Sequence, residues 1–81
     1  MVTIFPNPAQ DKISLEWNQK YGFEKIQQVK IVDVNGKEMY LDKTILTSPL
    51  IEIPIQQLPN GVYLLSVETE QSFSVQKFVK E

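Results

Sequence analysis

Along most of this chain, apolar and polar residues alternate with a period of two, which is the spacing of a β-strand with one buried face. The clearest case is KISLEW at residues 12–17, where every second side chain is apolar. A shorter stretch, VTIF at residues 2–5, predicts a strand ahead of it. Helical spacing is weak throughout, and only residues 21–28 favour a short helical turn, because apolar residues recur there at every third position.

The middle of the chain predicts a β-hairpin. Residues 29–34 are apolar on both faces, so this strand is central in a sheet or crosses from the core to a covered edge. The Asn35-Gly36 pair then predicts a type I′ turn, because that turn needs positive φ and both residues tolerate it. Residues 38–41 are the expected partner strand.

The remainder of the chain predicts further strands joined by turns. Residues 50–55 form a predicted strand that contains Pro54, which cannot donate a ladder hydrogen bond, so we expect an edge strand. Residues 42–48 are interpreted as a connection between sheets. A turn at residues 58–61 leads into a last hairpin of residues 62–68 and 72–79. About seven short strands with turn signals at intervals of roughly 8–12 residues favour an antiparallel β-sandwich, forming one domain over residues 1–81.

Composition excludes several kinds of chemistry. The 81 residues contain no cysteine and no histidine, so disulfides, thiolate chemistry and the commonest general base near neutral pH are absent. All eight positive charges are lysines and the net charge is −2, which gives little attraction to nucleic acid. No apolar run approaches the roughly 20 residues of a membrane span, and no signal peptide is recognisable. Because the first methionine directly precedes a predicted strand, we expect a domain excised from a longer protein.

The acidic and hydroxyl residues favour no catalytic or metal site. Calcium requires six to eight oxygen ligands brought together by a tight loop, whereas the acids here are scattered among lysines and fit solvated strand faces. Those acids are Asp11, Glu16, Asp33, Glu38 and Asp42. The serines have no histidine to activate them. We therefore expect no enzymatic activity and no cofactor.

The aromatic residues allow two interpretations. Trp17 continues the apolar face of its strand and is interpreted as core, although its ring could instead stack on a sugar. Tyr63 begins a strand two residues after Gly61, which predicts a tyrosine corner: a buried ring whose hydroxyl bonds back to a connecting loop. Tyr21, Phe23 and Tyr40 could line a binding patch. A carbohydrate- or protein-binding accessory module of a secreted enzyme is therefore the alternative function.

Two prolines near the start predict a stiff kink. In FPNPA at residues 5–9 they fix φ and force the preceding residues out of the helical region. Asn7, between them, can bond its side chain to nearby backbone. This element is either a corner at a sheet edge or a rigid recognition feature.

The order of these elements resembles the C-terminal sorting domain of type IX secretion substrates, the Por-secretion tail. The resemblance covers essentially the whole chain. It is carried by FPNPA, by VKIVDVNGK at residues 29–37, by PNGVYLL at residues 59–65 and by the closing QKFVKE. The final Glu81 departs from the pattern, since many members end on the basic residue.

The resemblance implies an immunoglobulin-like, all-β sandwich of about seven strands that serves as an address without catalysis. It implies a cargo fused before the domain, recognition by an outer-membrane translocon, cleavage upstream by a sortase-like peptidase, and a secreted or cell-surface destination. We expect the isolated domain to be a monomer, with no nucleic-acid partner and no membrane insertion. Motif by motif, the recognition residues carried over are Pro6, Asn7, Pro8, Gly36, Gly61, Tyr63, Lys77 and Lys80. An anchored last strand would present these lysines and the terminal carboxylate to a partner, or offer its edge for strand addition.

Overall fold

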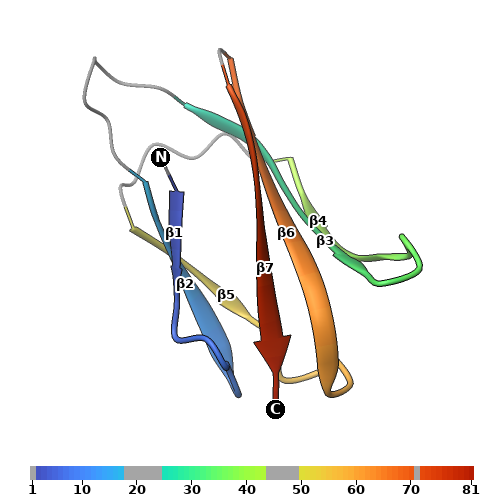
Figure 1. Cartoon of the computed structure of the whole chain (residues 1–81). Coiled ribbons are helices and arrows are strands. Elements are labelled where there is room, and N and C mark those ends of the chain that lie inside the picture. The colour runs from blue at the N-terminus through green and yellow to red at the C-terminus, as the bar shows by residue number, and fades with distance from the viewer. Residues whose placement is uncertain (1, 18–24, 44–49, 71) are drawn as a thin grey trace.

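The computed structural model describes residues 2–17, 25–43, 50–70 and 72–81. These residues form two antiparallel sheets that face each other (Figure 1). One sheet has the strand order β1-β2-β5 and the other has the order β4-β3-β6-β7. The predicted all-β sandwich is confirmed. The strands are β1 (Val2–Phe5), β2 (Lys12–Trp17), β3 (Ile26–Asp33), β4 (Glu38–Asp42), β5 (Leu50–Pro54), β6 (Gly61–Thr69) and β7 (Phe73–Lys80).

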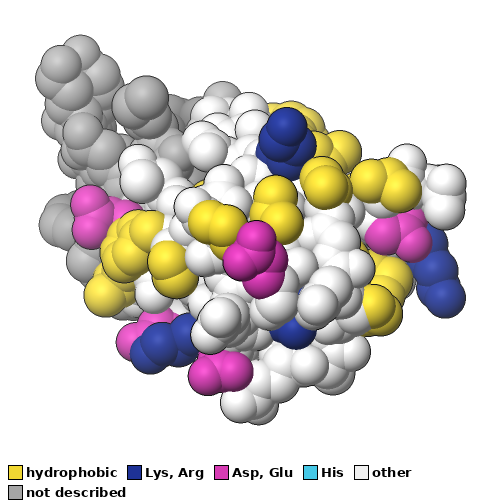
Figure 2. Space-filling view, turned by 60° about the horizontal axis from the view of Figure 1, so that its bottom comes forward, with side chains coloured by type: hydrophobic (Ala, Val, Ile, Leu, Met, Phe, Trp, Pro, Cys, Tyr) yellow, Lys and Arg dark blue, Asp and Glu magenta, His cyan; other side chains and the backbone are white. Residues whose placement is uncertain are grey.

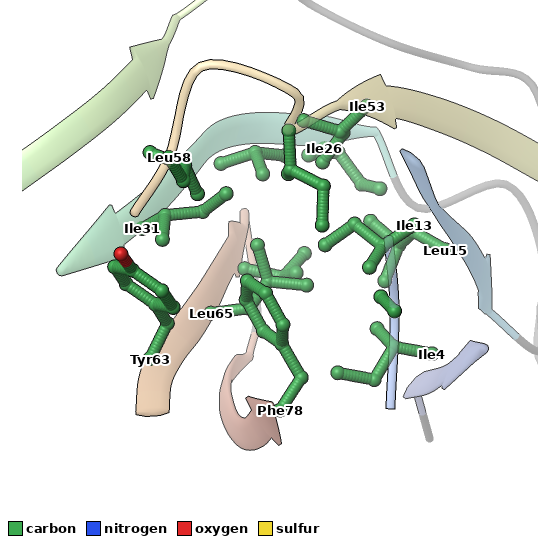
Figure 3. Packing of buried hydrophobic residues seen from close by; sticks show 14 residues of the cluster. Ile4, Ile13, Leu15, Ile26, Ile31, Ile53, Leu58, Tyr63, Leu65 and Phe78 are labelled. Atoms are coloured by element: carbon green, nitrogen blue, oxygen red, sulfur yellow. The ribbon is translucent and has the colours of Figure 1, made fainter. Parts of the chain in front are cut away.

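The core lies between the two sheets and is built from alternate residues of their strands. Ile13 and Leu15 of β2 meet Leu65 of β6 and Phe78 of β7, and all four side chains are fully buried. Figure 3 shows these side chains pointing toward one another from both sheets. Burial of each such side chain stabilises the fold by about 1.5–3 kcal/mol. The alternation of apolar and polar residues therefore places the apolar side chains on the inner faces of the two sheets, and their burial holds the sheets together.

The positions of β3 and β5 follow from their sequences. β3, which is apolar on both faces, lies between β4 and β6. β5 pairs only with β2, and its Pro54 stands opposite Lys12 at the end of the ladder. Both predictions, an inner strand and an edge strand, are confirmed, because a proline is tolerated where no further strand needs its missing N–H.

The β3–β4 hairpin forms, but the predicted type I′ turn is wrong. Gly36 has φ +83°, but Asn35 does not have the positive φ that a type I′ turn needs. No described residue other than glycine has a positive φ. The carboxylate of Asp33 explains the difference, because its Oδ1 accepts hydrogen bonds from the N–H groups of Asn35 and Lys37, both at 2.9 Å. The result is a three-residue connection with one left-handed glycine, and Val34 lies exposed in the turn.

The predicted helical turn over residues 21–28 is wrong for its described part. Ile26 to Gln28 belong to β3, and Ile26 is fully buried. Pairing with β6 therefore prevails over a weak local pattern. Residues 21–24, most of the expected connection at 42–48, and the side chain of Trp17 lie outside the described residues; Asp42 itself ends β4.

Candidate recognition surface at the C-terminal strand

The last strand, β7, is the edge of the four-stranded sheet. It pairs with β6 along its whole length, from Phe73 opposite Glu68 to Lys80 opposite Gly61. Because backbone groups of successive residues in a strand point to opposite sides, every second residue of β7 directs its N–H and C=O away from β6. These outward groups are where another segment can bind.

Residues 5–9, named here the proline segment, bind to the lower half of that edge. The Asn7 side chain accepts a hydrogen bond from the Val79 N–H at 3.0 Å and donates one from Nδ2 to the Lys77 carbonyl at 3.4 Å. The backbone of Ala9 accepts from the Glu81 N–H and donates to the Val79 carbonyl, both at 2.8 Å. Ala9 and Lys80 thereby form a parallel β-bridge. The C-terminus is fixed from both sides, by β6 and by the proline segment.

Asn7 acts in this contact as a peptide group does, because its amide offers one donor side and one acceptor side. The flanking bonds Phe5–Pro6 and Asn7–Pro8 are both cis. Pro6 and Pro8 themselves are exposed. Of the two interpretations of this element, the sheet-edge corner is thus what the structure shows, while its exposed prolines keep the recognition role as a prediction.

Lys80 is turned toward the interior and not toward solvent. It is only 9% exposed, and its Nζ donates a hydrogen bond of 3.1 Å to the carbonyl oxygen of Leu58. The ammonium group therefore ties the end of β7 to the loop that precedes β6. Lys77, by contrast, is exposed on the outer face of the sheet. The two lysines carried over as recognition residues thus differ in what a partner can reach.

Tyr63 forms the predicted tyrosine corner. Its ring is 4% exposed and stacks on Phe78, with centroids 5.5 Å apart and an interplanar angle of 24°. Its hydroxyl donates a hydrogen bond to the carbonyl of Pro59 in the connecting loop. Burial, and to a lesser degree the charge of Asp33, raises the pKa of the Tyr63 phenol above its ordinary value of 10.0. The prediction of a structural role for this tyrosine is confirmed.

The structure brings together most of the eight residues expected to take part in recognition. Pro6, Asn7 and Pro8 lie against the strand that carries Lys77 and Lys80. Gly61 and Tyr63 stand directly opposite Lys80 and Phe78 on β6. Gly36 lies apart, in the hairpin between β3 and β4 at the other side of the same sheet.

A shallow hollow of about 460 Å³ lies beside this surface. Its lining is Pro6, Pro8, Gln10, Asp11, Lys12 and Glu81. The final residue, a departure from the sequence pattern, therefore lies next to the prolines. In Figure 2, which brings the C-terminal end forward, apolar side chains form small groups separated by charged ones. This end of the molecule suits a contact of mixed polarity.

Sequence reasoning missed two contributors to this site. The pairing of Asn7 with β7 joins residues 70 and 72 positions apart, and only the placement of a polar amide between two prolines hinted at it. The inward direction of Lys80 could have been predicted from the alternation of side chains along a strand, because Lys80 and the apolar Phe78 are two residues apart and share one face.

The described residues contain no group of three or more acidic side chains placed to hold a metal ion. Nor does that part of the chain include a helix long and apolar enough to cross a membrane.

Fold and site together define a class: a small immunoglobulin-like β-sandwich whose final strand is anchored by β6 on one side and by the proline segment on the other. The chain belongs to the family described as secretion system C-terminal sorting domain, whose model matches residues 3–81. This family carries the sorting signal for type IX secretion, and such domains are non-catalytic in general. The signal leads across the outer membrane to the cell surface or the extracellular space. Among curated proteins, none matches the chain.

Proposed function

We propose that this domain is bound, in its folded form, by the outer-membrane translocon of the type IX system, and that a sortase-like peptidase then cuts upstream of it. The domain itself makes and breaks no covalent bond, so turnover of any substrate by the isolated chain would contradict this part. The observation that carries the proposal is the fixed C-terminal strand, held by β6 on one side and by the proline segment on the other.

A fixed strand favours recognition for a thermodynamic reason. Ordering one residue costs about 1–2 kcal/mol in backbone entropy, so a floppy tail would lose that energy upon binding. Here the backbone of residues 77–81 is already ordered by hydrogen bonds at Lys77, Val79 and Glu81. A partner can therefore bind the existing shape.

The residues available for contact and the residues that hold the strand have different parts in this proposal. Lys77, Pro6 and Pro8 are exposed and have side chains that make no polar contact within the described part of the domain, so they are the ones that a translocon can touch; Asn7 is exposed too, but its amide is already hydrogen-bonded to β7. The polar groups of three other residues are already hydrogen-bonded within the domain, so these residues act by positioning β7. They are Asn7, Tyr63 and Lys80.

The test is an export assay. Residues 1–81 are fused behind a reporter with a signal peptide, in a bacterium that has this secretion system, and the reporter is measured in the periplasm and outside the cell. We expect export, and retention in the periplasm would overturn the proposal. Lys77→Glu should lower export with the melting temperature unchanged, while Lys37→Glu, at a similarly exposed lysine in the β3–β4 hairpin, serves as the matched control.

The alternative of a carbohydrate-binding module gains no support from the two tyrosines that the structure describes. Tyr63 is buried and stacked on Phe78, and Tyr40 is half-buried against the core. A glycan screen with Trp17→Ala tests what remains of that hypothesis: saturable binding lost in this variant, with the fold intact, would favour it.

A further inference from the structure

Half of the outer edge of β7 is left open. The proline segment takes the Lys77 carbonyl and both backbone groups of Val79. By the alternation along a strand, the backbone groups of Phe73 and Val75 and the N–H of Lys77 point the same way as those of Val79. No described residue hydrogen-bonds to them. These outward groups of residues 73–77 are named here the open edge.

The side chains beside the open edge are apolar and exposed. Phe73 is 64% exposed and Val75 is 50% exposed, and both stand on the outer face of the sheet. Proteins protect sheet edges with charges, prolines or covering segments. This domain covers one half of the edge with the proline segment and leaves the other half regular, apolar and unpaired. That contrast marks the open edge as a place for another strand.

We propose that an extended segment of a partner protein adds to β7 along residues 73–77, as a fifth strand of the four-stranded sheet. The inference rests on the proposed function, since the partner belongs to the export machinery. The segment has apolar side chains beside Phe73 and Val75 and an acidic residue beside Lys77. Main-chain hydrogen bonds supply affinity and the alternate side chains supply specificity.

The proline segment defines the register of this added strand. Asn7 already occupies the Lys77 carbonyl and the Val79 N–H, so pairing cannot extend beyond Lys77. The parallel bridge of Ala9 with Lys80 shows that this edge accepts an extended segment, and the partner strand continues the same line.

Charge favours a foreign strand over a second copy of β7. Lys77 makes no salt bridge in the described part of the chain, and a carboxylate placed beside it gains a favourable charge pair. In an antiparallel pair of two β7 strands centred on Val75, the residue opposite Lys77 would be Phe73. A partner segment with an acidic residue therefore complements the open edge better than self-pairing.

The export assay above tests the inference with two variants of one residue. Val75→Pro removes an outward N–H without removing a hydrogen bond to β6, and prolines are tolerated on edge strands. Val75→Lys keeps the backbone and places a charge on the edge. Losing one or two main-chain hydrogen bonds, together with an apolar contact, lowers affinity by about tenfold. We expect export to fall accordingly, with cooperative unfolding retained in at least the lysine variant.

The matched control is Val62→Lys. Val62 is 39% exposed on the same outer face, but it belongs to the inner strand β6, so its backbone offers no edge. Wild-type export by this variant, with loss in both Val75 variants, supports strand addition. Equal loss in Val62→Lys, or wild-type export by the Val75 variants, overturns it.

Sedimentation of the unaltered chain completes the test. A monomer is expected, whereas a dimer that Val75→Pro dissociates would overturn the assignment to a foreign strand. If the unaltered domain itself fails to export the reporter, the proposed function falls and this inference falls with it. If the unaltered domain and both Val75 variants export equally, only the inference falls.

Discussion

Asn7 shows how a single side chain can replace a stretch of strand. Its amide makes two contacts with β7, one as donor and one as acceptor, and so continues the ladder where the chain turns. An aspartate at this position would retain the acceptor and lose the donor. The residue between the prolines therefore has a chemical requirement that only an amide of this length meets.

We predict that Asn7→Ala lowers the free energy of unfolding by about 1–2 kcal/mol, because two hydrogen bonds are lost and the Val79 N–H is left without its partner. Urea unfolding followed by circular dichroism measures the change. Gln10→Ala, at an exposed neighbour that lines the hollow, is the control and should leave the midpoint in place. An unchanged midpoint for Asn7→Ala would contradict the structural role.

Tyr63 predicts a loss of stability at alkaline pH. Its pKa in the folded state is raised, first by burial and then by the charge of Asp33. Between the ordinary value of 10.0 and the folded value, the unfolded chain loses the phenolic proton while the folded chain keeps it. The contribution of Tyr63 to stability is therefore fully present below about pH 10 and is lost as pH rises through the folded pKa.

The measurement is the urea midpoint as a function of pH for the wild type and Tyr63→Phe. The variant should lose about 1–2 kcal/mol near pH 7, because the Pro59 carbonyl loses its donor, and its midpoint should fall less steeply above pH 10. Parallel alkaline slopes for the two proteins would argue against this account. The pKa of Tyr40 is also raised, first by burial and then by Asp42. Its contribution to the alkaline loss of stability is the same in both proteins and cancels in the comparison.

At the scale of elements, strands were easier to predict than turns. Alternation identified β2, turn signals delimited the hairpin that contains β7, and Pro54 placed β5 at an edge. The β3–β4 turn was misjudged because a rule for Asn-Gly considers two residues, whereas the Asp33 carboxylate bonds across four. Likewise, the contact between the proline segment and β7 could not be predicted from local pattern, because it spans nearly the whole chain. The open edge was visible only once the covered half was known.

The same hairpin gives a prediction for Gly36. A Cβ there would meet no atom within 4 Å, so the cost of Gly36→Ala is conformational and comes from φ +83°. We expect a loss of about 1 kcal/mol, after the smaller entropy of the unfolded alanine chain is counted. Gly36→Asn should lose less, because asparagine tolerates the left-handed region. Thermal unfolding measures both, and equal stability of the three proteins would rule out the left-handed requirement.

At the scale of the whole molecule, the end of the chain is part of the core. Phe78 is fully buried between the sheets, and Lys80 reaches inward to Leu58. Figure 1 shows β7 running beside β6 toward the C-terminus, at the edge of its sheet that lies next to β1. Removing the end of the chain therefore disturbs the core, so export assays of truncations report on folding as well as on recognition.

We predict that deleting residues 77–81 removes the cooperative unfolding transition as well as export. Replacing a buried phenylalanine by alanine alone costs about 3–5 kcal/mol, which is most of the stability expected of a domain this short. Circular dichroism on heating tests this directly, with Lys77→Ala as the variant that should unfold normally. A truncated chain that still unfolds cooperatively would show that β7 is dispensable to the fold.

The bonds of Asn7 to Lys77 and Val79 have a consequence for protein synthesis. A ribosome makes the proline segment before it makes β7, so the two can meet only after translation has passed residue 80. A product that stops before residue 73 lacks β7, the strand to which Asn7 hydrogen-bonds. The closed sandwich therefore forms only in products whose translation has passed β7, and a secretion apparatus that binds only this closed form leaves products truncated before β7 unexported.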